Sequence, residues 1–159
     1  MLFKELGHIA FYTDRMDEMI DFYQNVLGAQ QKVVVKYKTY LDRDDRPYMQ
    51  AIARKTPEAV FNIYMELAPG QFVEFFPKAE SMVDDGEWNS RAGYNHFALI
   101  CDDIYATRAE LEGRGLAFDT QISRGPSGTY QMWAHDPDGN RFEIMQYTEE
   151  SYQIVGHID

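Results

Sequence analysis

Two pairs of segments in this sequence repeat each other, and each repeat carries one histidine and one glutamate at matching places. The aligned segments are GHIAF (7–11) with NHFAL (95–99), and GQFVEFF (70–76) with GNRFEIM (139–145). His8 therefore matches His96, and Glu74 matches Glu143. If the two halves bring these four side chains to one point, two imidazoles and two carboxylates form a divalent metal site.

Each glutamate stands among bulky apolar neighbours, in FVEFF and in RFEIM. A carboxylate buried in such surroundings is unfavourable unless a cation or strong hydrogen bonds compensate it. Either glutamate taken alone is equally consistent with a solvent-facing strand position, and a single strand histidine is most often structural. The duplication of the whole set is what favours a shared metal ion.

Other polar residues are weaker candidates for chemistry. Glu66 is a rival ligand in the strand before Glu74, but it has no partner in the repeat. His135 is expected at the edge of a turn, and His157 in a solvated tail. Cys101 is expected as a buried structural thiol, on the strand face opposite the ligands.

The elements that must position the ligands begin with the first half of the chain. The predicted elements are a strand (6–13), a helix (16–27), a Val-rich strand (31–37) and the two strands of a hairpin (60–67 and 71–76). Strand alternation places His8, Ala10 and Tyr12 on one face. We expect Asp14 to be the N-cap of the helix and Gly28 to end it.

The second half repeats this order. Its predicted elements are a strand (94–101), a helix ending around 113–115, a strand (116–122) and a hairpin (130–134 and 141–147). Asp102 and Asp103 are the expected helix caps. Each half is thus a strand, a helix and three strands, which gives an α+β fold of two tandem βαβββ modules, about 5–77 and 93–148, in a single domain over 1–159.

The two modules differ by an insertion. His8 and Glu74 are 66 positions apart and His96 and Glu143 are 47 apart, so the first module holds 19 more residues. The polar segment 38–58 accounts for the difference, and we expect a loop there, either a lid that touches substrate or a solvated excursion. Residues 78–92 are the expected linker, and 149–159 a tail with one or two helical turns.

Composition restricts the class of protein. The net charge of −11 argues against a nucleic-acid surface, which requires clustered Lys and Arg. A single cysteine excludes an internal disulfide framework and favours the cytoplasm. No apolar run approaches the roughly 18 residues of a membrane span, and the first residues lack the features of a signal peptide. We therefore expect a soluble protein with neither nucleic-acid nor membrane partners.

Four signatures together resemble the vicinal oxygen chelate superfamily, which includes glyoxalase I, methylmalonyl-CoA epimerase, fosfomycin-resistance proteins and extradiol dioxygenases. They are GHIAF (7–11), DFYQNVLG (21–28), NHFAL (95–99) and DPDGNRFE (136–143). The resemblance implies two modules whose curved mixed sheet encloses a metal held by His8, Glu74, His96 and Glu143. A full set of two His and two Glu ligands favours the glyoxalase-like branch.

The resemblance also implies a mechanism. A divalent Ni, Zn, Co or Mn ion polarises a carbonyl and an adjacent hydroxyl of the substrate, which acidifies the C–H bond between them. Glu143 is the preferred carrier of that proton, and Glu74 is its symmetric rival. The implied activity is that of a metal-dependent lyase related to lactoylglutathione lyase, acting on a vicinally oxygenated small molecule.

Two positions depart from the glutathione-using bacterial glyoxalases that the chain resembles. Their arginine four residues after the first histidine is Tyr12 here, and their asparagine four residues after the first glutamate is Lys78. A glutathione adduct is therefore one candidate substrate among several. By alternation, the pocket face gains a largely apolar wall, formed by Phe72, Phe76, Ile100 and Met145.

Two alternatives remain open from the sequence. One is an Fe(II) extradiol-type dioxygenase in which one carboxylate does not bind the metal. The other is a non-catalytic resistance protein that sequesters a ligand. In each case the resemblance implies a homodimer, and the site is built either within one chain or between two.

Overall fold

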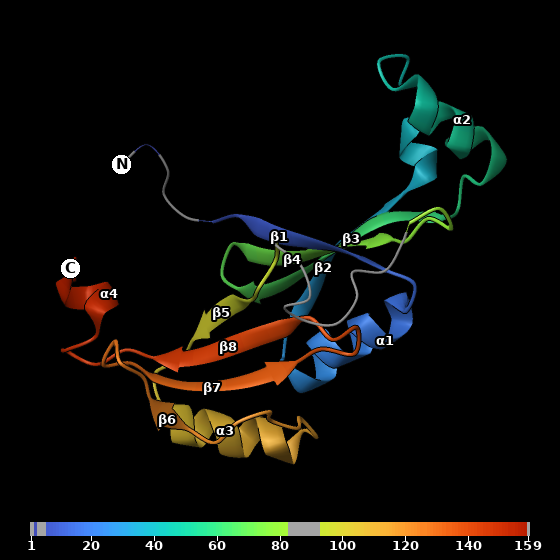
Figure 1. Cartoon of the computed structure of the whole chain (residues 1–159). Coiled ribbons are helices and arrows are strands. Elements are labelled where there is room, and N and C mark those ends of the chain that lie inside the picture. Colours follow the sequence, from blue (N-terminus) through green and yellow to red (C-terminus); the bar gives the residue numbers. More distant parts are fainter. Residues whose placement is uncertain (1, 3–5, 83–92, 159) are drawn as a thin grey trace. The chain divides into compact units, whose positions relative to one another are not determined.

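Each half of the chain builds one four-stranded mixed sheet with a helix of its own (Figure 1). The computed structural model of the protein describes residues 2, 6–82 and 93–158. The chain divides into unit 1, Met1–Met82, and unit 2, Val83–Asp159. The predicted α+β fold of two βαβββ modules is confirmed by the matching strand orders of the two sheets.

Unit 1 has the strand order β1-β4-β3-β2, in which β1 is parallel to β4 and the other pairs are antiparallel. Its elements are β1 (His8–Thr13), α1 (Met16–Asp21), the π-helical turn η1 (Phe22–Val26), β2 (Gln30–Lys36), the 3₁₀ helix η2 (Tyr37–Tyr40), α2 (Pro47–Lys55), β3 (Val60–Ala68) and β4 (Gln71–Pro77).

Unit 2 has the equivalent order β5-β8-β7-β6, again with one parallel pair, β5 with β8. Its elements are β5 (Phe97–Ile100), α3 (Ile104–Gly113), β6 (Ser123–Arg124), β7 (Tyr130–His135), β8 (Arg141–Gln146) and α4 (Tyr152–Val155). None of the helices in the described part of the chain has both the length and the apolar character needed to cross a membrane.

The two faces of the unit 1 sheet differ in burial, because side chains alternate along each strand. On β1, His8, Ala10 and Tyr12 are exposed, whereas the residues between them are more buried. The buried face packs against α1 and η1, whose Met19 and Tyr23 are fully buried, and the Tyr23 ring lies 5.0 Å from that of Phe75. The helix thus covers one face and leaves the other to the candidate ligands.

The first helix begins differently from the prediction. Its N-cap is Arg15 rather than Asp14, and no side chain caps it. The physical reason is local: the hydroxyl Oγ1 of Thr13 accepts the backbone N–H of Arg15 at 2.9 Å, so that the chain is still in a turn at Asp14. Gly28 follows the helical residues as predicted, with a positive φ of 77°.

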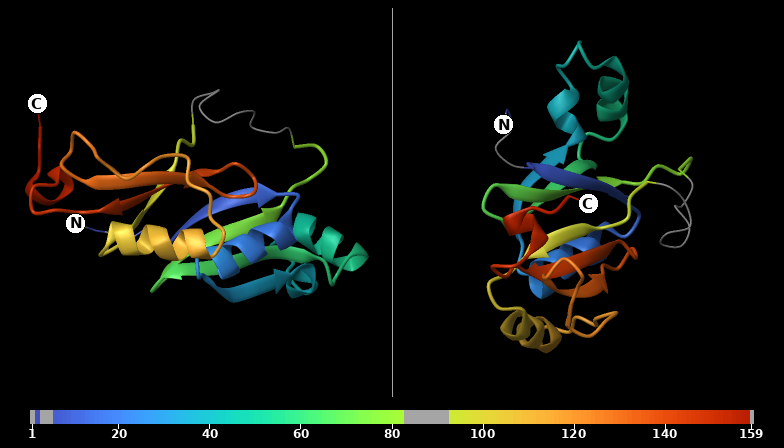
Figure 2. Two further views of the ribbon diagram at one scale, coloured as in Figure 1. Left: turned by 90° about the horizontal axis from the view of Figure 1, so that it is seen from below. Right: turned by 60° about the vertical axis from the view of Figure 1, so that its left-hand side comes forward.

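The insertion 38–58 is not the loop that was predicted. It holds part of η2 and the helix α2, which project beyond the end of the sheet (Figure 2). Pro47 stands at the start of α2, where a proline is well suited because its fixed φ is helical and its missing N–H needs no partner. Gln50 ties the helix to the preceding turn by donating to the carbonyl of Leu41 at 2.8 Å.

The predicted strand 116–122 of unit 2 is wrong, and the strand at this place is the two-residue β6. Asp119 donates its N–H to the Trp133 carbonyl at 2.8 Å, but the N–H of Trp133 is accepted by the Thr120 hydroxyl at 3.1 Å. The Thr120 hydroxyl therefore takes the place of the backbone carbonyl that would accept this N–H in a β-sheet. The first strand of this unit is also shorter than predicted, and His96 precedes it.

The other predicted elements are close to those observed. Asp103 caps α3 by accepting the N–H groups of Tyr105 and Ala106, both at 2.9 Å. Both hairpins form, and Asp136 closes the second by accepting N–H groups of Asp138 and Asn140. Of the predicted linker 78–92, residues 83–92 lie outside the described part of the chain.

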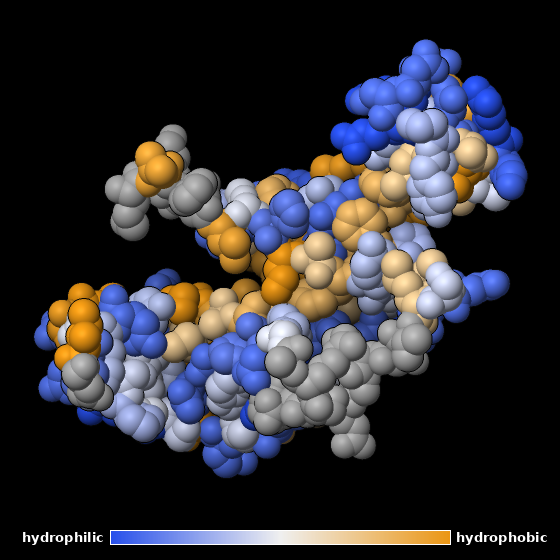
Figure 3. Space-filling model, turned by 45° about the horizontal axis from the view of Figure 1, so that its top comes forward, coloured by the Kyte–Doolittle hydropathy of each residue, from blue (hydrophilic) through white to orange (hydrophobic). Residues whose placement is uncertain are grey.

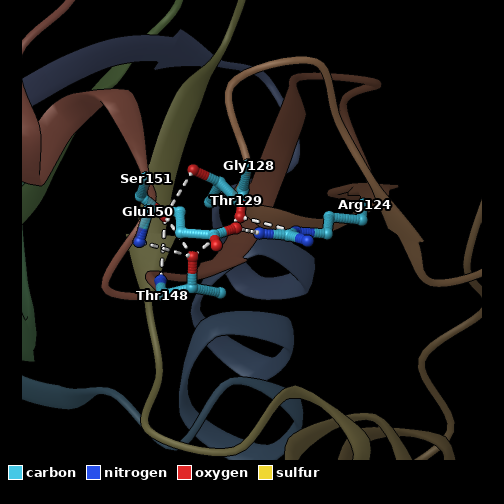
Figure 4. Close-up of polar contacts among 6 residues, drawn as sticks. All are labelled: Arg124, Gly128, Thr129, Thr148, Glu150 and Ser151. Atoms are coloured by element: carbon cyan, nitrogen blue, oxygen red, sulfur yellow. Dashed lines mark hydrogen bonds and ion pairs between the residues drawn. The ribbon is translucent and has the colours of Figure 1, made fainter.

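The tail that contains α4 is fastened to unit 2 by a polar network that is buried at Thr129 and Ser151 and exposed at Arg124 and Glu150 (Figure 4). Ser151 and Thr129 are fully buried and share a hydrogen bond of 3.0 Å between their hydroxyls. The Ser151 hydroxyl also accepts the N–H of Thr148 at 2.8 Å, and Arg124 pairs with Glu150 at 2.5 Å. Because its polar groups are paired, the network anchors the chain after β8.

Candidate metal centre

In unit 1, His8 and Glu74 lie side by side on the exposed face of the sheet. The parallel register places Ala10 opposite Glu74 and His8 opposite Phe72, so the histidine and the glutamate are diagonal neighbours. His8 Nε2 is 3.4 Å from Glu74 Oε2. Glu74 is only 4% exposed, whereas half of the His8 side chain is accessible. The pair therefore joins a buried carboxylate to an accessible imidazole.

Two neighbours on β3 hold the Glu74 carboxylate. Asn62 donates from Nδ2 to Glu74 Oε1 at 2.5 Å. Tyr64 lies directly opposite Glu74 in the antiparallel register; burial and a hydrogen bond to Glu74 raise its pKa to about 12. The Tyr64 ring also meets the His8 ring edge to face, with 5.7 Å between the centroids. Glu74 thus has a fixed orientation, with Oε1 bound by Asn62 and Oε2 next to His8.

The same pairing recurs in unit 2. Ala98 is opposite Glu143 in the parallel register, and His96 stands just before β5. His96 Nε2 is 3.6 Å from Glu143 Oε2, and Glu143 is 6% exposed. His96 Nδ1 lies 2.6 Å from the acceptor Asn95 Oδ1, and a proton on Nδ1 leaves the lone pair of Nε2 available to a metal ion.

The surroundings of Glu143 differ from those of Glu74. Trp133 occupies the place opposite Glu143 that Tyr64 occupies opposite Glu74. Its ring lies 4.7 Å from the His96 ring, edge to face, and the Arg141 guanidinium lies 4.3 Å from the Trp133 centroid. Within the described residues, Glu143 accepts no side-chain hydrogen bond comparable to the one from Asn62. Burial raises its pKa, and the charge of Arg141 opposes that effect. Burial and Arg141 lower the pKa of His96.

The donor atoms suit a divalent ion. Two ligands that each lie about 2.1 Å from one ion at angles of 90–110° are separated by about 3.0–3.5 Å. The His–Glu distances of 3.4 and 3.6 Å are close to this range. In the described part of the chain, no three His, Cys, Asp or Glu side chains are grouped to hold a metal. Each unit, taken by itself, thus offers one histidine and one glutamate as candidate ligands.

The weaker candidates have other partners. Glu66 pairs with Lys32 at 3.0 Å and accepts the N–H of Gly70 at 3.0 Å, and these contacts lower its pKa. His135 Nδ1 lies 2.8 Å from Asp119 Oδ1. Burial raises the pKa of the Cys101 thiol, which is unfavourable for a nucleophile.

The two positions that depart from the glutathione-using pattern differ in their exposure and in their contacts. Tyr12 is 58% exposed on the His8 face, with its ring 5.6 Å from that of Phe76. Lys78 is largely covered, and its Nζ lies 4.0 Å from an Asp14 carboxylate oxygen.

Three residues beside the candidate ligands were not predicted from the sequence: Asn62, Tyr64 and Trp133. A signal for Tyr64 and Trp133 exists in the hairpin turns. Counting back across the Pro69-Gly70 turn pairs position 64 with 74, and the same count across the second turn pairs 133 with 143. Hairpin register therefore identifies the side chain opposite each glutamate.

The chain matches the Glyoxalase/Bleomycin resistance protein/Dioxygenase superfamily over residues 5–144, and it belongs to that superfamily. This confirms the family predicted from the four sequence signatures. A comparison with curated proteins found no match.

Solved structures of the same fold share little sequence with the chain. A glyoxalase family protein from Enterococcus faecalis is 20% identical, with a TM-score of 0.66 over 91% of this chain and 99% of that one. A lactoylglutathione lyase from Agrobacterium tumefaciens is 20% identical, with a TM-score of 0.59 over 92% and 96%. A fosfomycin resistance protein from Listeria monocytogenes is 15% identical, with a TM-score of 0.59 over 94% and 98%. At these identities the likeness shows the fold.

Proposed function

We propose that the protein is a divalent-metal-dependent, glyoxalase-like lyase or isomerase that acts on a vicinally oxygenated small molecule. The observation that carries the proposal is the recurrence of one His–Glu pair in each unit, with donor atoms 3.4 and 3.6 Å apart. His8, Glu74, His96 and Glu143 hold the metal in this proposal. When bound, a divalent Ni, Co, Zn or Mn ion polarises a carbonyl and its adjacent hydroxyl and acidifies the C–H between them.

Glu143 is the proposed proton carrier. Its carboxylate takes the proton from one carbon and returns it to the neighbouring carbon, so that no other reactant is consumed. Glu74 is less suited to this role because Asn62 donates a hydrogen bond to its carboxylate and restrains its movement.

The proposal is tested by metal reconstitution followed by assay. The protein is stripped with a chelator, loaded in turn with Ni²⁺, Co²⁺, Zn²⁺ and Mn²⁺, and assayed for isomerisation of hemithioacetals of several thiols. Activity that depends on metal and is lost in His96→Ala, but kept in the control His135→Ala, supports the proposal. Protein that remains inactive and metal-free under all four conditions contradicts it.

The same preparations separate the alternatives. Oxygen uptake with catechols after Fe(II) loading identifies a ring-cleaving oxygenase. Tight ligand binding without turnover, retained in His96→Ala, identifies a sequestering protein.

We also propose a homodimer in the cytoplasm, in which unit 1 of one protomer and unit 2 of the other supply one ligand set. The single cysteine is in keeping with a reducing compartment.

A mixing experiment tests this arrangement. One variant carries His8→Ala and Glu74→Ala, and the other carries His96→Ala and Glu143→Ala; each is inactive alone. After unfolding and joint refolding, half of the dimers are mixed and each has one intact site. Recovery of about one quarter of the wild-type activity is expected. No recovery would place the complete site within one chain.

A further inference from the structure

Five aromatic rings of unit 1 form a connected group beside the His8–Glu74 pair. We call this group the aromatic shelf; it consists of Tyr12, Tyr37, Tyr40, Phe61 and Phe76. Phe76 contacts Tyr12 at 5.6 Å and Phe61 at 5.4 Å between ring centroids. Phe61 in turn meets Tyr37 at 5.5 Å and Tyr40 at 5.1 Å, both edge to face. The rings come from β1, β3, β4 and the 3₁₀ helix η2.

The shelf begins next to the candidate ligands. The parallel register pairs Tyr12 with Phe76 and Ala10 with Glu74. Residues two apart on a strand share a face and lie about 7 Å apart. A molecule held by Glu74 therefore reaches the Phe76 ring across one row of the sheet. Ala10, the exposed residue between His8 and Tyr12, has a short side chain that leaves this path open.

One edge of the aromatic shelf is accessible to solvent, and the shelf carries little charge. Tyr12 is 58% exposed, whereas the other four rings are partly covered. Burial raises the pKa of Tyr37, and the neighbouring phenols of Tyr48, Tyr40 and Tyr12 add to the effect, so the Tyr37 hydroxyl stays uncharged. Hydrophobic surface gathers at the base of the α2 segment, whose outer part is hydrophilic (Figure 3).

The cations at the border of the shelf already have carboxylate partners. Lys36 and Lys38 both pair with Glu58, at 2.9 and 3.1 Å. Lys78 lies near Asp14. A substrate carboxylate would have to compete with these contacts, whereas a flat uncharged group needs only the ring faces and edges.

Unit 2 has no equivalent shelf among its described residues. Ile100 stands at the place of Tyr12 and is paired with Met145, which stands at the place of Phe76. Both are aliphatic, and no segment corresponding to η2 and α2 follows β6. The shelf is therefore a feature of the inserted segment together with unit 1, and it is not required by the repeated fold.

We propose that the aromatic shelf binds an uncharged aryl group of the substrate, whose vicinal oxygens are held at the His–Glu pairs. The substrate class is thus an aryl-substituted carbonyl compound with an adjacent oxygen, in place of a substrate held by its carboxylate. This inference rests on the proposed metal-dependent function. Tyr12 is the specificity-determining residue, because it is the exposed ring at the edge of the shelf.

Two hydroxamates test the proposal through binding rather than turnover. Acetohydroxamate and benzohydroxamate present the same pair of vicinal oxygens, but only the second carries a ring. Their dissociation constants are measured by calorimetry on the metal-loaded wild type, on Tyr12→Ala and on the matched control Ile100→Ala. The preference for benzohydroxamate is expected to fall about 5–10-fold in Tyr12→Ala, as for loss of one ring contact, and to be unchanged in Ile100→Ala.

The outcomes separate the two proposals. If acetohydroxamate binds and Tyr12→Ala leaves the preference unchanged, the shelf proposal is overturned and the metal site stands. An equal loss in Ile100→Ala also overturns it. If neither hydroxamate binds the metal-loaded protein, the metal-dependent function fails and the shelf proposal fails with it.

Discussion

The two His–Glu pairs occupy equivalent places in the two units, but their carboxylates are held in different ways. Glu74 accepts a hydrogen bond from Asn62 and lies opposite Tyr64 across the hairpin. Glu143 faces Trp133 and is buried without comparable side-chain donors among the described residues, which raises its pKa. The two units thus share the His–Glu pair and differ in the residue opposite each glutamate. The difference favours a fixed ligand in unit 1 and a mobile base in unit 2.

The largest effects are expected when each glutamate is neutralised in turn, which tests the proposed difference between Glu74 and Glu143. Glu143→Gln is expected to lower kcat by about 10²–10⁴-fold at saturating metal, as for loss of a general base. Glu74→Gln is expected to weaken metal binding more than it lowers kcat, because its role is to hold the ion. Steady-state kinetics over a metal titration measures both effects. Equal losses of kcat in the two variants would remove the distinction between the units.

A second prediction concerns the side chains opposite the glutamates. Tyr64→Phe removes one hydroxyl that orients Glu74, and it is expected to weaken metal affinity by about 10-fold. Trp133→Phe is the matched control in unit 2 and is expected to change metal affinity much less. Calorimetric titration of the chelator-treated proteins with Co²⁺ measures the change. An equal or larger effect of Trp133→Phe would contradict the assigned roles.

The smallest predicted effect is on the stability of the metal-free protein. Because the pKa of Glu143 is raised in the folded state, the folded protein favours the protonated form and loses stability as the pH rises through that pKa. Glutamine at position 143 carries no charge. The free energy of unfolding of Glu143→Gln is therefore expected to exceed that of the wild type only slightly in acid and by about 1 kcal/mol at neutral pH.

Urea unfolding with a chelator present, at acidic and neutral pH, measures this gain. Glu74→Gln is the control and is expected to destabilise the protein, because it disturbs the hydrogen bond from Asn62. A stability gain from Glu143→Gln that decreases as the pH rises would contradict the prediction.

Much of this arrangement follows from local sequence patterns. Alternation predicts which strand face carries His8, but its proximity to Glu74 depends on the parallel pairing of β1 with β4, for which the repeated motif was the only signal. The helix α2 was missed because its polar composition resembles a loop, although Pro47 marks its start. The strand 116–122 was predicted wrongly because the Thr120 hydroxyl accepts a hydrogen bond that a backbone carbonyl would accept in a sheet. The alternation of polar and apolar residues gives no sign of such a side-chain contact.

The central claim is that the two His–Glu pairs act together on one divalent ion. Titration of chelator-treated protein with Co²⁺, followed by calorimetry, tests it most directly. We predict one high-affinity ion per chain, lost both in His8→Ala and in His96→Ala, and kept in His135→Ala. Two independent ions per chain, or full binding in either ligand variant, would contradict the claim.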